Sequence, residues 1–123
     1  MSESTREIEE LTKELVEFFQ ERDWTKFHSP KNIVMALASE VGELIDPFRF
    51  LTEEESFNLD EKTRQDVADE LGDVMIFVTY LSHLLKMDPI EAAREKMKKN
   101  SERYPADLVK GNKEKYTHYE PKL

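Results

Sequence analysis

Two short segments, thirty residues apart, each contain a glycine with a carboxylate residue on both sides. The surrounding sequence pattern predicts that each segment lies in the interior of a helix. They are Ser39 to Ile45 and Asp69 to Met75, and from its Glu onward each reads Glu, aliphatic, Gly, acid, apolar, apolar. Glycine inside a helix costs about 1 kcal/mol relative to alanine, so helix stability does not explain its presence. The repeated pattern therefore predicts two helices that meet for a reason beyond the burial of aliphatic side chains.

Acids three residues apart project from the same side of a helix, one turn from each other. If the two helices pack antiparallel, with the glycines letting the backbones approach closely, Glu40, Glu43, Glu70 and Asp73 converge. Four carboxylates can share a small volume only if cations compensate them or protons neutralise them. Ligands that are all oxygen suit a hard cation, Mg²⁺ or Mn²⁺, so the pattern predicts a metal site.

The rest of the chain reads as helical. Apolar residues recur at helical spacing, no alternation typical of a strand persists, and Ser29-Pro30, Asp60 and Asp88-Pro89 are helix start signals. Pro47 is expected to kink or close the second helix near its end. The sequence predicts an all-α, four-helix bundle, completed by oligomerisation, with helices at roughly 4–21, 30–50, 60–86 and 89–103.

One catalytic domain is expected over residues 1–105. Residues 106–123 carry many charges and few aliphatics, which predicts a mostly irregular tail that packs on the domain or on a neighbouring subunit. Residues 52–59 are expected to form a solvated acidic connection.

Composition excludes several classes of protein. A net charge of −9 argues against a nucleic acid polymer as partner, because such binding needs a basic stripe. The absence of cysteine excludes disulfides and thiolate metal sites. No signal peptide is evident in the first twenty residues, and the longest apolar run, Val74 to Leu85, is too short to span a bilayer. We therefore expect a cytoplasmic protein that does not bind membranes.

Two other metal sites do not match the pattern. A di-iron carboxylate bundle needs Glu-x-x-His, but the residues three positions after the first acids are Glu43 and Asp73. The twelve-residue loop of a calcium EF-hand is absent as well. An all-oxygen cluster suits phosphate-ester hydrolysis, in which a divalent cation neutralises substrate oxygens. The alternative is a non-catalytic helical interaction module whose acids bind a structural metal or a basic partner.

The spacing Glu40-x-x-Glu43 and, after 26 residues, Glu70-x-x-Asp73 resembles the metal motif of MazG-type nucleoside triphosphate pyrophosphohydrolases, in the all-α NTP pyrophosphatase superfamily. Further segments resemble the branch of dCTP pyrophosphatases, so that the similarity covers about residues 8 to 118. These segments are Arg22-Asp23-Trp24, Phe27-His28-x-Pro30-x-Asn32, Lys96-Met97, Asn100, Arg103-Tyr104-Pro105 and Lys115-Tyr116-Thr117.

The resemblance implies hydrolysis of a (deoxy)nucleoside triphosphate, with dCTP or a modified dCTP as the leading substrate, to the monophosphate and pyrophosphate. Such an activity would remove unwanted nucleotides from the pool. Mg²⁺ would be held by the four acids, and the enzyme would be a homodimer or a dimer-of-dimers homotetramer with sites shared between subunits. In the mechanism that we favour, Glu43 or Glu70 takes a proton from the water that attacks the α-phosphorus, and the sequence does not choose between them.

The resemblance also implies residues that bind the substrate. The phosphates would be contacted by residues of the last helix, and the base would be stacked between aromatic rings. The residues implied are Lys96 and Asn100 for the phosphates, with Tyr104 nearby, Trp24, Phe50 and Phe77 for the base, and His28 in the adjacent loop. Trp24 and Phe50 could instead be core or interface aromatics, Lys96 could belong to a solvated face, and His28 could be structural. Phe50 and Leu15 depart from residues common in the branch, which loosens the expected base preference.

Overall fold

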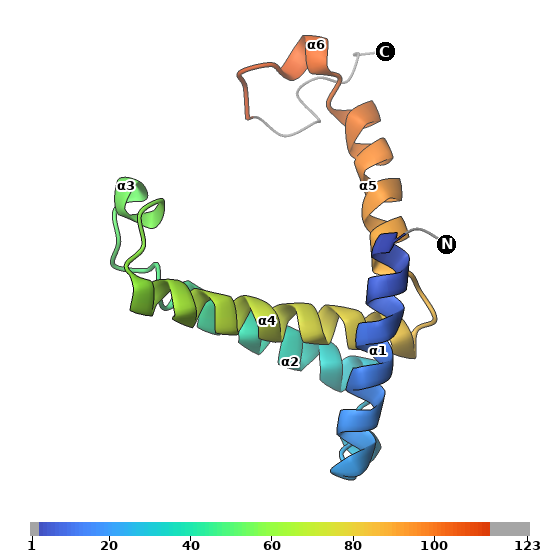
Figure 1. The fold of residues 1–123 in the computed structure, drawn as a ribbon. Coiled ribbons are helices and arrows are strands. Elements are labelled where there is room, and N and C mark those ends of the chain that lie inside the picture. Colours follow the sequence, from blue (N-terminus) through green and yellow to red (C-terminus); the bar gives the residue numbers. More distant parts are fainter. Residues whose placement is uncertain (1–2, 114–123) are drawn as a thin grey trace. The chain divides into compact units, whose positions relative to one another are not determined.

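The computed structural model of the chain describes residues 3–113, and every regular element in this range is a helix (Figure 1). The predicted all-α fold is thereby confirmed. None of the described helices is long and apolar enough to cross a membrane. The elements are α1 (Glu3–Glu21), η1 (Thr25–Phe27), α2 (Pro30–Ile45), α3 (Glu53–Ser56), α4 (Glu61–Leu84), α5 (Pro89–Arg103) and α6 (Ala106–Val109).

The helix starts follow from local capping chemistry. The Ser29 hydroxyl accepts a hydrogen bond from the backbone N–H of Asn32 ahead of a proline, and the Asp60 carboxylate accepts one from the N–H of Thr63 at 2.7 Å. Asp88 caps α5 in the same way. Each cap satisfies a backbone donor that the first turn of a helix leaves unpaired. These three predicted starts are confirmed.

α1 and α4 each end in a Schellman motif built on a residue that is not glycine. Asp23 and Lys86 adopt left-handed backbone conformations, with φ of 55° and 56°. The next N–H in each case reaches back to the last turn, from Trp24 to the carbonyl of Phe19 and from Met87 to that of Ser82. These bonds satisfy carbonyls that the helix end would otherwise leave free.

The second helix is shorter than predicted. It ends at Ile45 and not near residue 50, and residues 46–50 form turns in which the N–H groups of Phe48 and Arg49 both donate to the Ile45 carbonyl. Pro47 explains the difference, because it has no N–H to donate and its ring clashes with the carbonyl four residues earlier. The expectation for residues 52–59 also missed α3, which a capping box between Thr52 and Glu55 starts.

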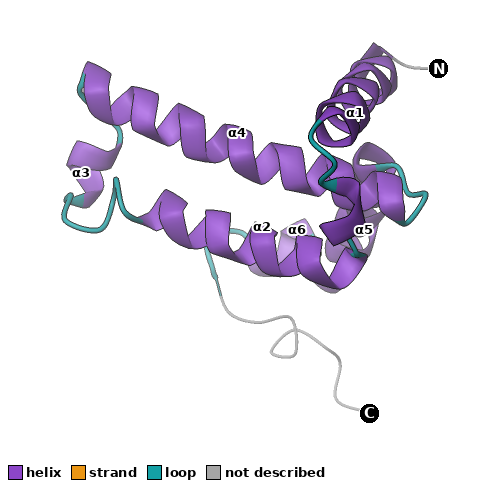
Figure 2. Cartoon of the chain, turned by 90° about the horizontal axis from the view of Figure 1, so that it is seen from below, coloured by secondary structure: helices purple, strands orange, loops and turns teal. Residues whose placement is uncertain are grey.

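The chain divides into two compact units, residues 1–87 and 88–123, and each is described by itself. In the first unit, α2 and α4 run antiparallel and side by side, and α1 crosses near the C-terminal end of α4 (Figures 1 and 2). Its core contains Leu15 and Phe19 of α1, Ile33 of α2 and Tyr80 of α4. The second unit contains α5 and α6, and α6 falls in the segment that was expected to be mostly irregular.

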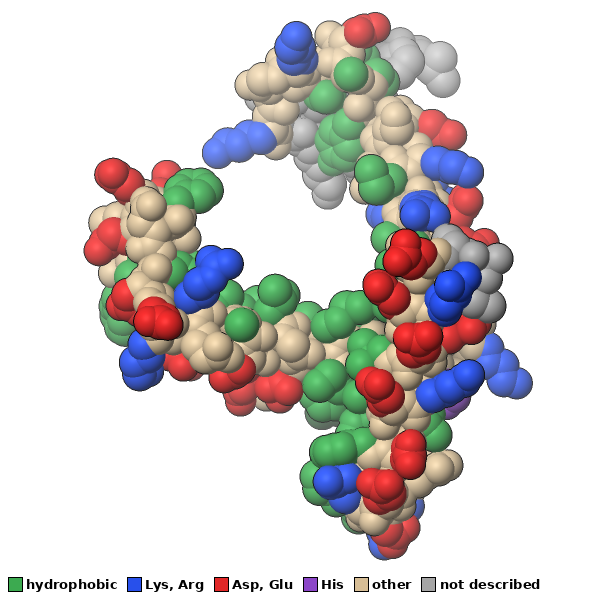
Figure 3. All heavy atoms as spheres, viewed as in Figure 1, with side chains coloured by type: hydrophobic (Ala, Val, Ile, Leu, Met, Phe, Trp, Pro, Cys, Tyr) green, Lys and Arg blue, Asp and Glu red, His purple; other side chains and the backbone are tan. Residues whose placement is uncertain are grey.

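Much of the apolar surface of the first unit stays exposed. One set of large apolar side chains recurs at helical spacing along α2 and α4, beside the stripes through which these helices meet. Hydrophobic side chains gather along one edge of this helix pair, and carboxylates along the other (Figure 3). We call this set the apolar face; it contains Val34, Val41, Ile45, Leu71 and Met75.

Candidate metal centre

The antiparallel packing of α2 and α4 brings the acids of the two repeated segments together. One carboxylate oxygen from each of Glu40, Glu43 and Glu70 lies within 4.8 Å of the others. Asp73 lies outside this group of three, but it is close enough for its charge to raise the pKa of both Glu40 and Glu70. Helix geometry explains the convergence, since residues three apart share one side of each helix.

Burial makes this cluster electrostatically strained. Burial, followed by a hydrogen bond and charge repulsion from Glu43, raises the pKa of Glu40 to about 7. Burial also raises the pKa of Glu70, with Glu43 as the next cause. One oxygen of each side chain, Oε2, is buried and has no hydrogen-bond partner among residues 3–113. Buried polar atoms are normally paired, so these two oxygens call for a ligand.

A hard divalent cation fits this donor set. Glu40, Glu43 and Glu70 offer only oxygen atoms, two of them buried and unpaired, and such oxygens are the ligands that Mg²⁺ and Mn²⁺ prefer. A cation would compensate the negative charge that burial concentrates here. These three residues would hold the metal, and the role of Asp73 as a fourth ligand stays a prediction.

The explanation offered for the glycines is wrong within this chain. A Cβ atom built on Gly42 or Gly72 would meet nothing within 4 Å, and both residues are exposed. The helical period accounts for this, because two residues after Glu40 or Glu70 the chain has turned by about 200° from the acid's side. The close packing of α2 on α4 therefore does not depend on either glycine.

The acids open into a depression with a volume of about 500 Å³. Glu43 and Glu70 line it, together with three further acids and Pro47. These acids were not predicted as site residues, although Asp46 follows Glu43 by three residues and Asp66 precedes Glu70 by four, which places each pair on one side of its helix. They are Asp46, Asp66 and Asp69.

The residues implied for the base do not all meet. Trp24 and His28 lie near the start of α2, and both pack against Phe19. The centre of the Phe19 ring lies 4.5 Å from that of the His28 ring, which is edge-on to it, and 6.4 Å from that of the Trp24 ring. Phe77 is half-buried against the same core. Phe50 follows the other end of α2 and is 87% exposed. A 16-residue helix is about 24 Å long, so Trp24 and Phe50 of one chain cannot enclose one base.

The residues implied for the phosphates lie in the second unit. Lys96 and Asn100 are exposed and four residues apart, which places them on one side of α5. The backbone N–H of Tyr104 donates to the Asn100 carbonyl at 2.8 Å as the helix ends. Their role toward a substrate stays a prediction, and Lys115-Tyr116-Thr117 lies outside the described residues.

Comparison with known proteins gives consistent results. The MazG nucleotide pyrophosphohydrolase domain matches residues 28–108. The dCTP pyrophosphatase 1 of Homo sapiens is 38% identical over 112 residues, and that of Mus musculus is 37% identical. Each match covers 89% of this chain but 66% of the relative, so the chain spans slightly less than two thirds of these proteins. A crystal structure of a pyrophosphatase from Archaeoglobus fulgidus matches with a TM-score of 0.75 and 37% identity, over 80% of this chain and 93% of that one.

Proposed function

Because the chain belongs to the MazG nucleotide pyrophosphohydrolase domain family, we propose that it is a hydrolase of (deoxy)nucleoside triphosphates. Its products would be the nucleoside monophosphate and pyrophosphate, and its leading substrate dCTP or a modified dCTP, since two of its relatives are named dCTP pyrophosphatase. The observation that carries the proposal is the cluster of Glu40, Glu43 and Glu70, with its unpaired buried oxygens, inside the matched domain.

A divalent cation, Mg²⁺ or Mn²⁺, held by these carboxylates would supply charge neutralisation for the phosphate oxygens. The residues themselves would orient and deprotonate the nucleophile. As a water attacks the α-phosphorus, its proton passes to Glu43 or Glu70, and the bond from the α-phosphorus to the oxygen that bridges to the β-phosphate breaks. That oxygen leaves with pyrophosphate.

The experiment is a pyrophosphate-release assay with a panel of dNTPs, NTPs and base-modified triphosphates in Mg²⁺. We expect Glu43→Gln or Glu70→Gln to lower turnover by at least about 100-fold, as loss of a general base does. Glu14→Gln, at an exposed acid of α1, is the control and should keep full activity. Wild-type turnover in both site variants would contradict the assignment, and release of orthophosphate would contradict attack at the α-phosphorus.

A homo-oligomer, a dimer or a dimer-of-dimers tetramer, belongs to this proposal. The apolar face leaves Val41, Ile45 and Leu71 about half exposed, which favours a partner over solvent. The distance between Trp24 and Phe50 within one chain supports the same conclusion. If both rings stack on the base, a second copy must contribute one of them. Leu15 belongs to the core and so leaves base recognition to other residues.

The comparisons favour the enzyme over the alternative of a non-catalytic interaction module. The two differ in a measurable way, because an enzyme of this kind should be stabilised jointly by Mg²⁺ and nucleotide. An interaction module should not respond to nucleotide. The proposed compartment is the cytoplasm, where free nucleotides are available.

A further inference from the structure

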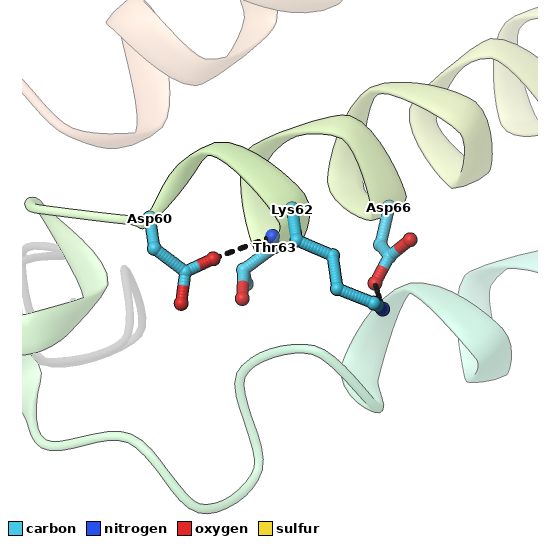
Figure 4. Close-up of polar contacts among 4 residues, drawn as sticks. All are labelled: Asp60, Lys62, Thr63 and Asp66. Carbon is cyan, nitrogen blue, oxygen red and sulfur yellow. Dashed lines mark hydrogen bonds and ion pairs between the residues drawn. The ribbon is translucent and has the colours of Figure 1, made fainter.

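Two cationic side chains stand at the edge of the depression, each paired with an acid that lines it. Arg49 Nη1 lies 3.6 Å from Asp46 Oδ1, just beyond the end of α2. Lys62 Nζ lies 3.0 Å from Asp66 Oδ2 in the first turns of α4 (Figure 4). Because α2 and α4 are antiparallel, the end of one and the start of the other meet at the same end of the helix pair. We call Arg49 and Lys62 the rim cations.

These ion pairs are weak enough to exchange. Both join residues within one turn of the chain, and the side chains of Arg49 and Lys62 are 57% and 86% exposed. Exposed pairs of this kind contribute little to stability. The Arg49 contact is also longer than a hydrogen bond. The Arg49 guanidinium carbon also lies 4.9 Å from the centre of the Phe50 ring, a weak contact that persists when the pairing with Asp46 changes.

The depression needs such cations if a polyanion is to enter it. Five of its six lining residues are Asp or Glu. A divalent cation held by Glu40, Glu43 and Glu70 would compensate these three acids, but Asp46 and Asp66 line the depression one helical turn beyond them. There the phosphates of a substrate would meet uncompensated carboxylates, unless cations stand between them. Arg and Lys both bind phosphate, and Arg can do so with two parallel hydrogen bonds.

The order of residues along α2 and α4 indicates which residues each phosphate of a substrate would meet. The α-phosphate must lie at Glu43 and Glu70, where the proposed attack takes place. One turn toward the open end, about 5.4 Å, leads from these residues to Asp46 and Asp66. A further turn of chain leads to the rim cations. If the two terminal phosphates, which leave together as pyrophosphate, extend in this direction from the α-phosphate, they meet the rim cations.

We propose that Arg49 and Lys62 bind the β- and γ-phosphates of the substrate, and that they exchange Asp46 and Asp66 for phosphate oxygens as it enters. This inference rests on the proposed function. It also predicts that the rim cations contact pyrophosphate and not the monophosphate product. The roles implied for Lys96 and Asn100 on α5 stay a separate prediction.

The test measures binding by titration calorimetry in Mg²⁺. The probes are pyrophosphate, dCMP and a dCTP analogue with an imido group between its α- and β-phosphates, which is not cleaved. We expect the double variant Arg49→Gln/Lys62→Gln to bind pyrophosphate and the analogue at least about tenfold more weakly, as loss of two charge-assisted contacts should cause. Binding of dCMP should change less than twofold. Arg64→Gln, at an exposed arginine of α4, is the matched control.

Arg49→Lys keeps the charge and should recover part of the lost affinity. Unchanged affinity of the double variant for pyrophosphate overturns the inference, and so does an equal loss for dCMP. Wild-type protein that does not bind pyrophosphate overturns it as well, whether or not it is active. Wild-type protein that binds pyrophosphate through the rim cations but hydrolyses no triphosphate supports the inference and contradicts the proposed function, so the two can fail separately.

Discussion

Glu40 shows how one residue links the packing of the helices to a ligand. Burial and the neighbouring carboxylates raise its pKa from an ordinary 4.5 to about 7, which disfavours its charged form. In the unfolded chain this pKa returns to its ordinary value. Between these pH values the folded protein therefore binds more protons than the unfolded chain, so the free energy of unfolding falls as pH rises.

We predict that the metal-free protein melts at a lower temperature at pH 8 than at pH 5.5. This decrease in melting temperature should be larger, by roughly 5 °C, than the change that Glu40→Gln shows over the same pH range. The variant is the necessary reference, because burial lowers the pKa of His28 and makes stability rise with pH near the ordinary pKa of histidine. Thermal melts followed by circular dichroism measure both proteins. Addition of Mg²⁺ should raise the melting temperature more at pH 8 than at pH 5.5. Parallel pH profiles of the two proteins would contradict the prediction.

Thr79 offers a second test at a single residue. Its side chain is fully buried in α4, and no residue within 3–113 offers its Oγ1 a hydrogen-bond partner. Thr79→Val keeps the shape and removes an unpaired hydroxyl, so it should raise the free energy of unfolding by about 1 kcal/mol. Thr12→Val is the control. The Thr12 hydroxyl donates a hydrogen bond to the Ile8 carbonyl at 2.7 Å, so its removal should not raise the free energy of unfolding. Urea unfolding compares the two, and a destabilised Thr79→Val would refute the argument.

The metal centre shows what could be predicted from single residues. Glu40, Glu43 and Glu70 were found because they repeat a spacing on two helices, and the structure brings them together. Asp46 and Asp66 were missed, since an exposed acid beside a cation reads as an ordinary surface pair. Their importance depends on the antiparallel register of α2 and α4, which places two helix ends side by side. That register is not visible in either segment alone.

At the scale of the helices, the starts of the four predicted helices lie within one residue of the prediction, and the end of α2 is the one bound that was clearly misplaced. A helix start often has a side chain that accepts a hydrogen bond from the backbone of the first turn. Such N-cap residues can be recognised in the sequence, and here they are Ser29, Asp60 and Asp88. The end of α2 is harder to predict, because Pro47 allows the helix either to continue with a kink or to end before it. In the structure α2 ends at Ile45, and turns follow in which backbone N–H groups donate to the Ile45 carbonyl. The Schellman end at Asp23 lacks the usual glycine, and so its signal is weak.

The glycines of α2 and α4 lead to a prediction about these helices. Since a Cβ at Gly42 or Gly72 meets nothing within 4 Å, alanine at either position should raise the free energy of unfolding by about 1 kcal/mol. The reverse changes Ala38→Gly and Ala68→Gly, at exposed positions of the same helices, should lower it by a similar amount. Chemical denaturation measures all four. Destabilisation by Gly→Ala would mean that the added methyl group meets another molecule, such as a second copy of the chain.

Residues 3–113 form a small core relative to their exposed apolar surface. Within this range four large apolar side chains are buried, in one cluster where α1 crosses α4. The sequence pattern predicted amphipathic helices, but it could not separate the stripe that packs within the chain from the apolar face beside it. Both recur at the same helical period, and only the position of α1 and the pairing of α2 with α4 tell them apart.

The apolar face leads to the prediction for the assembly. Leu71 is 56% exposed on α4, so a charge there should cost the single chain little. In an oligomer that buries this face, the same charge would lose its water. We therefore expect Leu71→Asp to shift the protein toward monomers in light scattering coupled to size exclusion, and to lower triphosphate hydrolysis with it. Leu71→Met keeps the position apolar and should keep the wild-type mass. A wild-type protein that is monomeric at assay concentration, or a Leu71→Asp variant with unchanged mass, would show that the apolar face does not join subunits.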